Sequence, residues 1–210
     1  MTTPDPQPPA SNTPSDGAST DTVHRSAAGI AGGVLLLALV GWLGVDALLT
    51  GDGQVPWLAL AGLLLLVPLI AAFTLRPAVF VNDDRLRLRN PFRIVVLPWA
   101  AVAAFRSGYS NEVLDASGRK YQLWSIPVSL RGRKKAARRQ NRAMADGTAA
   151  GADDPFRATT DQIMDQLAER KEARAAAGTS QGEVTVRWAY EVLAPALAGG
   201  VLLLILLAIG

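Results

Sequence analysis

The side chains in this chain that are best suited to binding a ligand are seven cations in one short run. The run RGRKKAARRQNR spans Arg131–Arg142 and contains no acidic residue. Its cations are Arg131, Arg133, Lys134, Lys135, Arg138, Arg139 and Arg142. Basic side chains close to a membrane surface are attracted to anionic lipid, by about 1 kcal/mol each. We therefore take these seven residues as a candidate lipid-binding site.

Two other interpretations of the basic run stay open. A run of positive charge is often a solvated loop that binds nothing, because charge alone establishes little about a ligand. Contact with nucleic acid is the third interpretation. It is the least favoured of the three, because no aromatic residue interleaves the run to stack on bases.

Catalytic and metal-binding residue types are scarce in the rest of the chain. There is no cysteine, which excludes a disulfide, a thiolate metal site and a cysteine nucleophile. The one histidine, His24, lies in a polar N-terminal segment, so no imidazole is available for a triad in the folded part. The adjacent carboxylates Asp83 and Asp84 have too few further oxygen ligands for a Ca²⁺ cage and fit a turn better. We predict a protein that is not an enzyme and that has no metal or cofactor.

Three long apolar runs determine the fold class. Half of the chain is hydrophobic, and these residues concentrate in Ala27–Leu49, Val55–Leu75 and Trp188–Ile209. A helix that crosses a bilayer needs about 20 apolar residues, and each run is long enough. The sequence therefore predicts a transmembrane helical hairpin at residues 27–75 and a C-terminal transmembrane helix at residues 188–210. Pro68 should kink the second helix, which membrane helices tolerate.

The basic residues also predict the orientation of these helices. Of the 21 Lys and Arg residues, 20 lie between Arg76 and Arg187, and the other is Arg25. Short segments rich in Lys and Arg stay on the cytoplasmic side of a membrane. We predict a multi-pass protein of the inner (plasma) membrane, with the N-terminus and the middle region in the cytoplasm and the C-terminus outside.

The middle region has the pattern of short strands. Residues 78–126 predict about six strands in an antiparallel meander. The clearest is RLRLR, Arg85–Arg89, whose alternation places Leu86 and Leu88 on one face and the arginines on the other. A helix near Pro155–Ala177 would cover the apolar face of the sheet, which cannot stay exposed to water.

The remaining segments are polar or rich in small residues. Residues 1–26 are rich in Pro, Ser, Thr and Asp, and we expect a disordered leader there. We expect a flexible basic insertion at residues 131–154, and a linker at residues 178–187 that leads into the last membrane helix.

Two stretches carry a resemblance to a known family. RPAVFVNDDRLRLRNPFRIVVLPWAAVAAF, Arg76–Phe105, has Arg-Pro before a strand, an acidic turn, an RNPFR hairpin and a Pro-Trp pair, and DASGRKYQLWSIPVSL, Asp115–Leu130, follows it. In this order the motifs resemble the bacterial pleckstrin-homology-like (PH) domain of actinobacterial membrane proteins, the family named for a low-molecular-weight protein antigen. The resemblance implies a PH-like domain at residues 76–177, with a curved antiparallel sheet closed by a C-terminal helix. It implies no enzyme activity.

The family's best-known ligand does not follow from this resemblance. Eukaryotic relatives often bind phosphoinositides through a basic loop between the first two strands. Here that loop is Asn82–Arg85, which is acidic where a phosphate would need Lys and Arg. The resemblance therefore does not carry phosphoinositide binding over to this chain.

Taken together, these observations predict a non-catalytic, membrane-anchored PH-like protein that acts as an interaction or scaffold module at the inner leaflet. The expected partners are membrane lipids and a membrane protein. The alternative is an accessory or regulatory subunit of a membrane enzyme or transporter complex. Gly29 and Gly33 form a GxxxG pattern that could pack against a helix, although chance favours such pairs in Ala- and Gly-rich spans.

Overall fold

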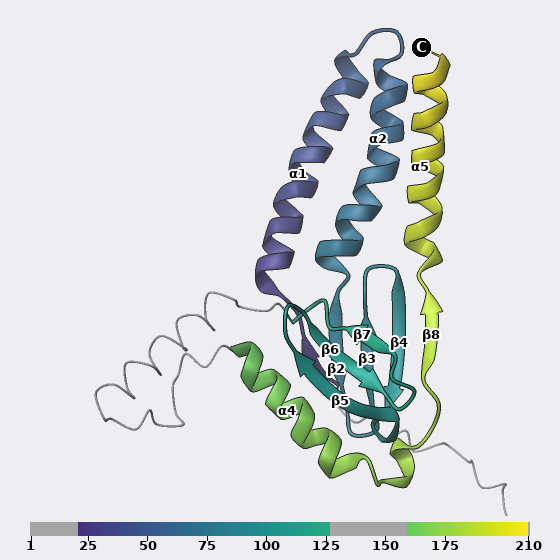
Figure 1. Cartoon of the computed structure of the whole chain (residues 1–210). Coiled ribbons are helices and arrows are strands. Elements are labelled where there is room, and N and C mark those ends of the chain that lie inside the picture. The colour runs from purple at the N-terminus through teal and green to yellow at the C-terminus, as the bar shows by residue number, and fades with distance from the viewer. Residues whose placement is uncertain (1–20, 127–158, 210) are drawn as a thin grey trace, which may run out of the picture.

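The computed structural model describes residues 21–126 and 159–209. Within them, three apolar helices stand side by side at one end, and two small sheets with a further helix lie at the other end (Figure 1). The apolar helices are α1 (Ala27–Thr50), α2 (Val55–Ile70) with its π-helical continuation η1 (Ala71–Leu75), and α5 (Tyr190–Ile209). Each is long and apolar enough to cross a membrane.

Local chemistry explains how these helices begin and change pitch. Ser26 caps α1, because its hydroxyl accepts a hydrogen bond from the Gly29 N–H at 3.1 Å. Pro68 lies inside α2 and has no N–H to donate to the helical ladder. The π-helix η1 begins three residues later and ends where the Arg76 N–H donates to the Ala71 carbonyl at 2.9 Å.

Close contacts hold the three helices together at both ends. Gly33 of α1 lies against Thr74 of η1, where any Cβ on the glycine would overlap the threonine side chain. Gly33 therefore has a packing role within the chain, which the GxxxG pattern alone did not establish. At the far end, the Gln54 side-chain amide donates to the Leu206 carbonyl at 2.7 Å, so the α1–α2 loop is bonded to the C-terminal turns of α5.

The strands form two antiparallel sheets. The larger has the order β1-β2-β3-β4-β8 and the smaller the order β5-β6-β7. The strands are β1 (Thr22–His24), β2 (Ala78–Val81), β3 (Arg85–Arg89), β4 (Arg93–Pro98), β5 (Val102–Ser107), β6 (Asn111–Asp115), β7 (Lys120–Gln122) and β8 (Thr185–Trp188). A 3₁₀ turn, η2 (Trp99–Ala101), leads from one sheet to the other. The strands predicted within residues 78–126 are confirmed, but they divide between two sheets.

The alternation in Arg85–Arg89 places side chains as the sequence predicts. Leu86 and Leu88 are fully buried, whereas Arg85 is exposed. Both leucines belong to the core enclosed by the two sheets, together with Val95 and Trp99. This core is what positions the turns and the surface described below.

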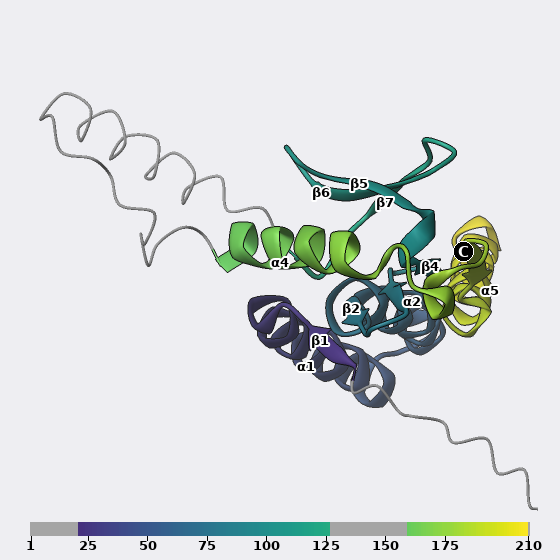
Figure 2. The same cartoon turned by 90° about the horizontal axis from the view of Figure 1, so that it is seen from below.

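Helix α4 (Thr159–Arg174) covers the core at its open side. Met164 and Leu167 are buried in the same cluster as the sheet residues, and Figure 2 shows α4 passing between the smaller sheet and the strands β1 and β2. The helix predicted near Pro155–Ala177 is thus confirmed as the cover of the sheet, within the residues that the structure describes. The chain then passes through the 3₁₀ turn η3 (Gly178–Ser180) toward β8.

Two segments differ from the sequence prediction. The end of the expected leader is strand β1, in which Val23 pairs with Phe80 of β2. The end of the expected linker is strand β8, in which Val186 pairs with Val95 of β4. Both are edge strands, which are held by backbone hydrogen bonds to a neighbour and need little apolar pattern of their own. For the same reason the last helix begins at Tyr190, after the strand, and not at Trp188.

Candidate functional site

The seven basic residues predicted to bind lipid cannot be placed. Arg131, Arg133, Lys134, Lys135, Arg138, Arg139 and Arg142 all lie outside the described residues. The candidate sites therefore come from two other clusters of polar side chains, one at each end of the β2–β3 hairpin.

The first cluster is the acidic turn between β2 and β3. The Asn82 side-chain oxygen accepts hydrogen bonds from the Asp84 N–H at 3.0 Å and the Arg85 N–H at 2.8 Å. The Asn82 carbonyl accepts a third bond, from the indole N–H of the fully buried Trp99, at 3.0 Å. The turn is thus fixed to the core by its own side chain and by Trp99, in agreement with the prediction that these carboxylates mark a turn.

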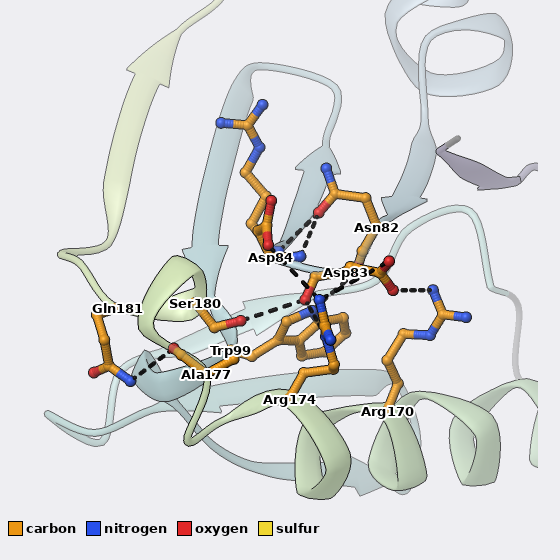
Figure 3. Close-up of polar contacts among 10 residues, drawn as sticks. Asn82, Asp83, Asp84, Trp99, Arg170, Arg174, Ala177, Ser180 and Gln181 are labelled. Atoms are coloured by element: carbon orange, nitrogen blue, oxygen red, sulfur yellow. Dashed lines mark hydrogen bonds and ion pairs between the residues drawn. The ribbon is translucent and has the colours of Figure 1, made fainter. Parts of the chain in front are cut away.

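The acidic turn holds the C-terminal end of α4 (Figure 3). Carboxylate oxygens of Asp83 lie 3.7 Å from an Arg170 guanidinium nitrogen and 3.9 Å from one of Arg174. The Arg174 Nε donates to the Asp83 carbonyl at 2.9 Å, and the Ser180 hydroxyl donates to the same oxygen at 3.3 Å. These ion pairs are exposed, so each contributes about 1 kcal/mol at most. Their role is to position α4 and η3, and the turn presents acceptors where a phosphate would need donors.

An open groove of about 500 Å³ lies beside this contact, between β1 and α4. Its lining includes His24, Asp83, Leu167, Glu169 and Arg170. Burial lowers the pKa of the His24 imidazole, which favours the neutral ring. The lining mixes both signs of charge with apolar surface and defines no single ligand chemistry.

The second cluster lies at the opposite end of the β2–β3 hairpin, against the apolar helices. Arg89 is the last residue of β3 and pairs with Ala78, the first residue of β2. Arg76 follows η1, and Arg25 precedes α1. These three arginines line a shallow surface cavity of about 260 Å³, which is open on one side. The other lining residues are apolar and come from the helices; they are Ala71, Ala72, Leu75 and Val192.

The arginines of this cavity are only partly neutralised. The Arg76 side chain is 8% exposed, and its Nη1 lies 2.7 Å from a carboxylate oxygen of Glu191. Its Nε donates to the Asn90 carbonyl at 3.3 Å. Within the described part of the chain, Arg76 Nη2 and Arg89 Nε are buried without a hydrogen-bond partner. The pKa of Arg89 is lowered, first by burial and then by the positive charges of Arg76 and Arg25.

Sequence reasoning did not identify this cluster as a site. In the sequence, Arg25 and Arg76 enter only the distribution of basic residues that predicts the orientation of the helices. Arg89 was assigned to the outer face of a strand. The β2–β3 register brings Arg89 and Arg76 together, because Arg89 pairs with Ala78, two residues after Arg76. The described residues include no group of three or more His, Cys, Asp or Glu that could hold a metal ion.

Comparison with known proteins identifies part of the chain. Residues 76–152 match the family model of the bacterial PH domain. This stretch is therefore similar to a bacterial PH domain, a class of module that is in general non-catalytic and that often binds lipids or proteins. The match includes strands β2 to β7 and leaves out β1, β8 and α5. No curated protein and no solved structure matches the chain.

Proposed function

We propose that this protein is a non-catalytic, membrane-anchored PH-like module that presents an interaction surface at the inner leaflet of the plasma membrane. One observation carries the proposal: each apolar helix is joined through one or two residues to a strand of the same five-stranded sheet. Two residues separate β1 from α1, two separate η1 from β2, and one separates β8 from α5. The connecting residues are Arg25 and Ser26, Arg76 and Pro77, and Ala189.

Such short connections suit a scaffold. A flexible linker would let the domain diffuse near the membrane, whereas connections of one or two residues fix its height and its orientation. The contact is reinforced where Phe92, at the tip of the β3–β4 hairpin, packs against Ala72, Ala189 and Val192. The Phe92 ring also meets Phe73 of η1 edge to face, with 5.2 Å between the centroids. Partners would then meet the exposed surfaces of the smaller sheet and α4.

The same arrangement supports the proposed orientation. Because β1 pairs with β2, the segment before α1 lies on the same side of the helices as the PH-like domain. The C-terminus lies at the opposite end, beside the α1–α2 loop (Figure 1). Since 20 of the 21 basic residues lie between Arg76 and Arg187, the domain side is the cytoplasmic side.

Single cysteines test this orientation, because the chain has none of its own. Asp52→Cys lies in the α1–α2 loop, and Tyr109→Cys lies in the β5–β6 turn, where the native side chain is 98% exposed. A membrane-impermeant thiol reagent that reaches the outer face of the inner membrane should label the Asp52 variant in intact cells. It should label the Tyr109 variant only after permeabilisation. Labelling of the Tyr109 variant in intact cells would overturn the proposal.

Purification from a mild detergent tests the interaction role. Substitution of exposed residues on the smaller sheet should release a partner that is bound to the PH-like domain. If the partner is a stoichiometric membrane enzyme or transporter that stays bound despite these substitutions, the protein is an accessory subunit docked through its helices.

The basic run at residues 131–142 is proposed as an electrostatic contact with anionic lipid. Its tethering to a membrane-anchored domain raises the local lipid concentration, so weak attraction suffices. Replacing its seven cations with Gln should reduce the binding of the protein to anionic vesicles at low salt. The difference between the native and the substituted protein should disappear at 1 M salt, where the Debye length is about 3 Å.

A further inference from the structure

The arginine cavity at the base of the helices has more positive charge than its protein neighbours neutralise. Arg25 connects β1 to α1, Arg76 connects η1 to β2, and Arg89 ends β3; the three line one space of about 260 Å³. Among the described contacts of this cavity, Glu191 supplies the carboxylate, and it is paired with Arg76. Three guanidinium groups thus share one carboxylate, which leaves net positive charge in the cluster.

Two hydrogen-bond donors of the cluster are left without partners. Arg76 Nη2 and Arg89 Nε are buried and make no hydrogen bond within the described residues. A buried charged donor without an acceptor is unfavourable, and such groups in native proteins usually mark a bound water, ion or ligand. Both side chains line the cavity. An acceptor bound in the cavity would complete their hydrogen bonding.

Helix ends of both polarities meet at the cavity. Both α1 and α5 begin at this end of the molecule, and Val192 in the first turn of α5 lines the cavity, whereas η1 ends here and contributes Ala71, Ala72 and Leu75. The N-terminal end of a helix carries partial positive charge and the C-terminal end partial negative charge, so the three arginines set the sign of the potential. The cavity is therefore suited to an anion rather than to a neutral or cationic group.

The walls of the cavity indicate which anion. One side consists of the apolar side chains Ala71, Ala72, Leu75 and Val192, which belong to the helix ends. A free ion in water would gain nothing from such a wall, whereas the glycerol and upper acyl carbons of a lipid would be buried against it. Exposed aromatic side chains at the same level, Trp188 and Tyr190, are typical of the membrane–water interface, where lipid phosphates lie.

We propose that this cavity binds the phosphate group of an anionic membrane lipid, with Arg25, Arg76 and Arg89 as its cationic ligands. Guanidinium groups suit this role, because their planar forks match phosphate oxygens. The site lies at the other end of the β2–β3 hairpin from the acidic turn Asn82–Asp84, and its lining residues are different from those of the basic run. The inference deepens the proposed function, on which it rests, by naming a ligand class for the membrane-facing end of the domain.

Binding of short-chain lipids to the full chain in neutral detergent tests the proposal. Dihexanoyl phosphatidylglycerol should bind at least tenfold more tightly than dihexanoyl phosphatidylcholine, because the choline cation would be repelled by the arginines. Arg89→Gln and, separately, Arg25→Gln should each weaken phosphatidylglycerol binding about tenfold. Arg93→Gln is the matched control: its guanidinium lies over the Trp188 ring, 5.3 Å from the centroid, at the same end of the sheet. It should change binding less than twofold.

Three results would overturn the proposal. They are equal binding of the two lipids, unchanged binding in both cavity variants, and displacement of phosphatidylglycerol by an equal concentration of inorganic phosphate, which would make the cavity a free-phosphate site. Melting temperatures identify a variant that fails to fold, and Arg25→Gln provides an independent test because the native side chain is exposed. The cysteine-labelling experiment can fail without affecting this assay, so an error in the orientation and an error in the ligand are distinguishable.

Discussion

Leu88 should contribute several times more to stability than its neighbour Arg87. Leu88 is fully buried, and its cross-strand neighbours are Val79 and Val95. Leu88→Ala removes three carbon atoms, or about 2.4 kcal/mol of transfer free energy at about 0.8 kcal/mol for each. The paired strands hold the neighbouring side chains in place, so a cavity remains. The expected loss in the free energy of unfolding is about 3 to 5 kcal/mol.

Arg87 lies on the opposite face, and its contacts are weaker. Its guanidinium carbon lies 4.2 Å from the centroid of the Phe80 ring. A guanidinium nitrogen is 3.3 Å from a carboxylate oxygen of Asp21. Both members of this ion pair are more than a third exposed, so solvent screens it. Contacts of these two kinds contribute about 0.5 to 1 kcal/mol each, and Arg87→Ala should therefore cost about 1 kcal/mol.

Pulse proteolysis of the full chain in nanodiscs across a urea gradient measures this difference. With a slope of about 2 kcal/mol per molar urea, Leu88→Ala should lower the midpoint by about 2 M and Arg87→Ala by about 0.5 M. Equal shifts for the two variants would refute the register of β3 and the placement of its leucines in the core.

Three further predictions concern packing and pH. Gly33→Leu should lower the melting temperature of the full chain in detergent, because the new side chain would displace Thr74, whereas Gly32→Leu should not, since a Cβ there meets open space. The pKa of His24 is lowered by burial, so the urea midpoint should be highest above about pH 6.5 and fall as the pH drops below it; His24→Gln should remove this decline. The pKa of Asp115 is lowered, chiefly by the hydrogen bond from the Ser117 hydroxyl, so its carboxylate stabilises the fold above about pH 4, and this contribution is lost as the pH falls through the folded-state pKa. Asp115→Asn should lower the melting temperature at pH 7 and show less further loss on acidification than the native chain.

Elements with a strong repeating pattern could be predicted from the sequence. The three apolar helices follow from the length of their runs, and Leu86 and Leu88 follow from strict alternation. The covering helix followed from its apolar face, and Leu167 is indeed in the core. In each case the residues that carry the signal are also the residues that are buried, so a local pattern was enough.

Edge strands and the arginine cavity could not be predicted in this way. Strand β1 has only three residues, which show no alternation of apolar and polar side chains long enough to predict a strand. Strand β8 is not predicted, because Arg187 and Trp188 also fit the start of a membrane helix. The cavity depends on the pairing of Arg89 with Ala78 and on the approach of α5 to η1. Both are long-range arrangements, and single-sequence patterns do not specify them.

The placement of β1 and β8 at the two edges of one sheet has a consequence for biosynthesis. Strand β1 is made before the first span, but its partner β2 is made only after the second, and β8 precedes the third. If only one of the two helices of the hairpin crossed the membrane, β1 would be left across the bilayer from β2, whose edge would stay unpaired. Exposed strand edges promote aggregation. Under the proposed membrane topology, completion of the sheet therefore requires that both helices of the hairpin span the membrane.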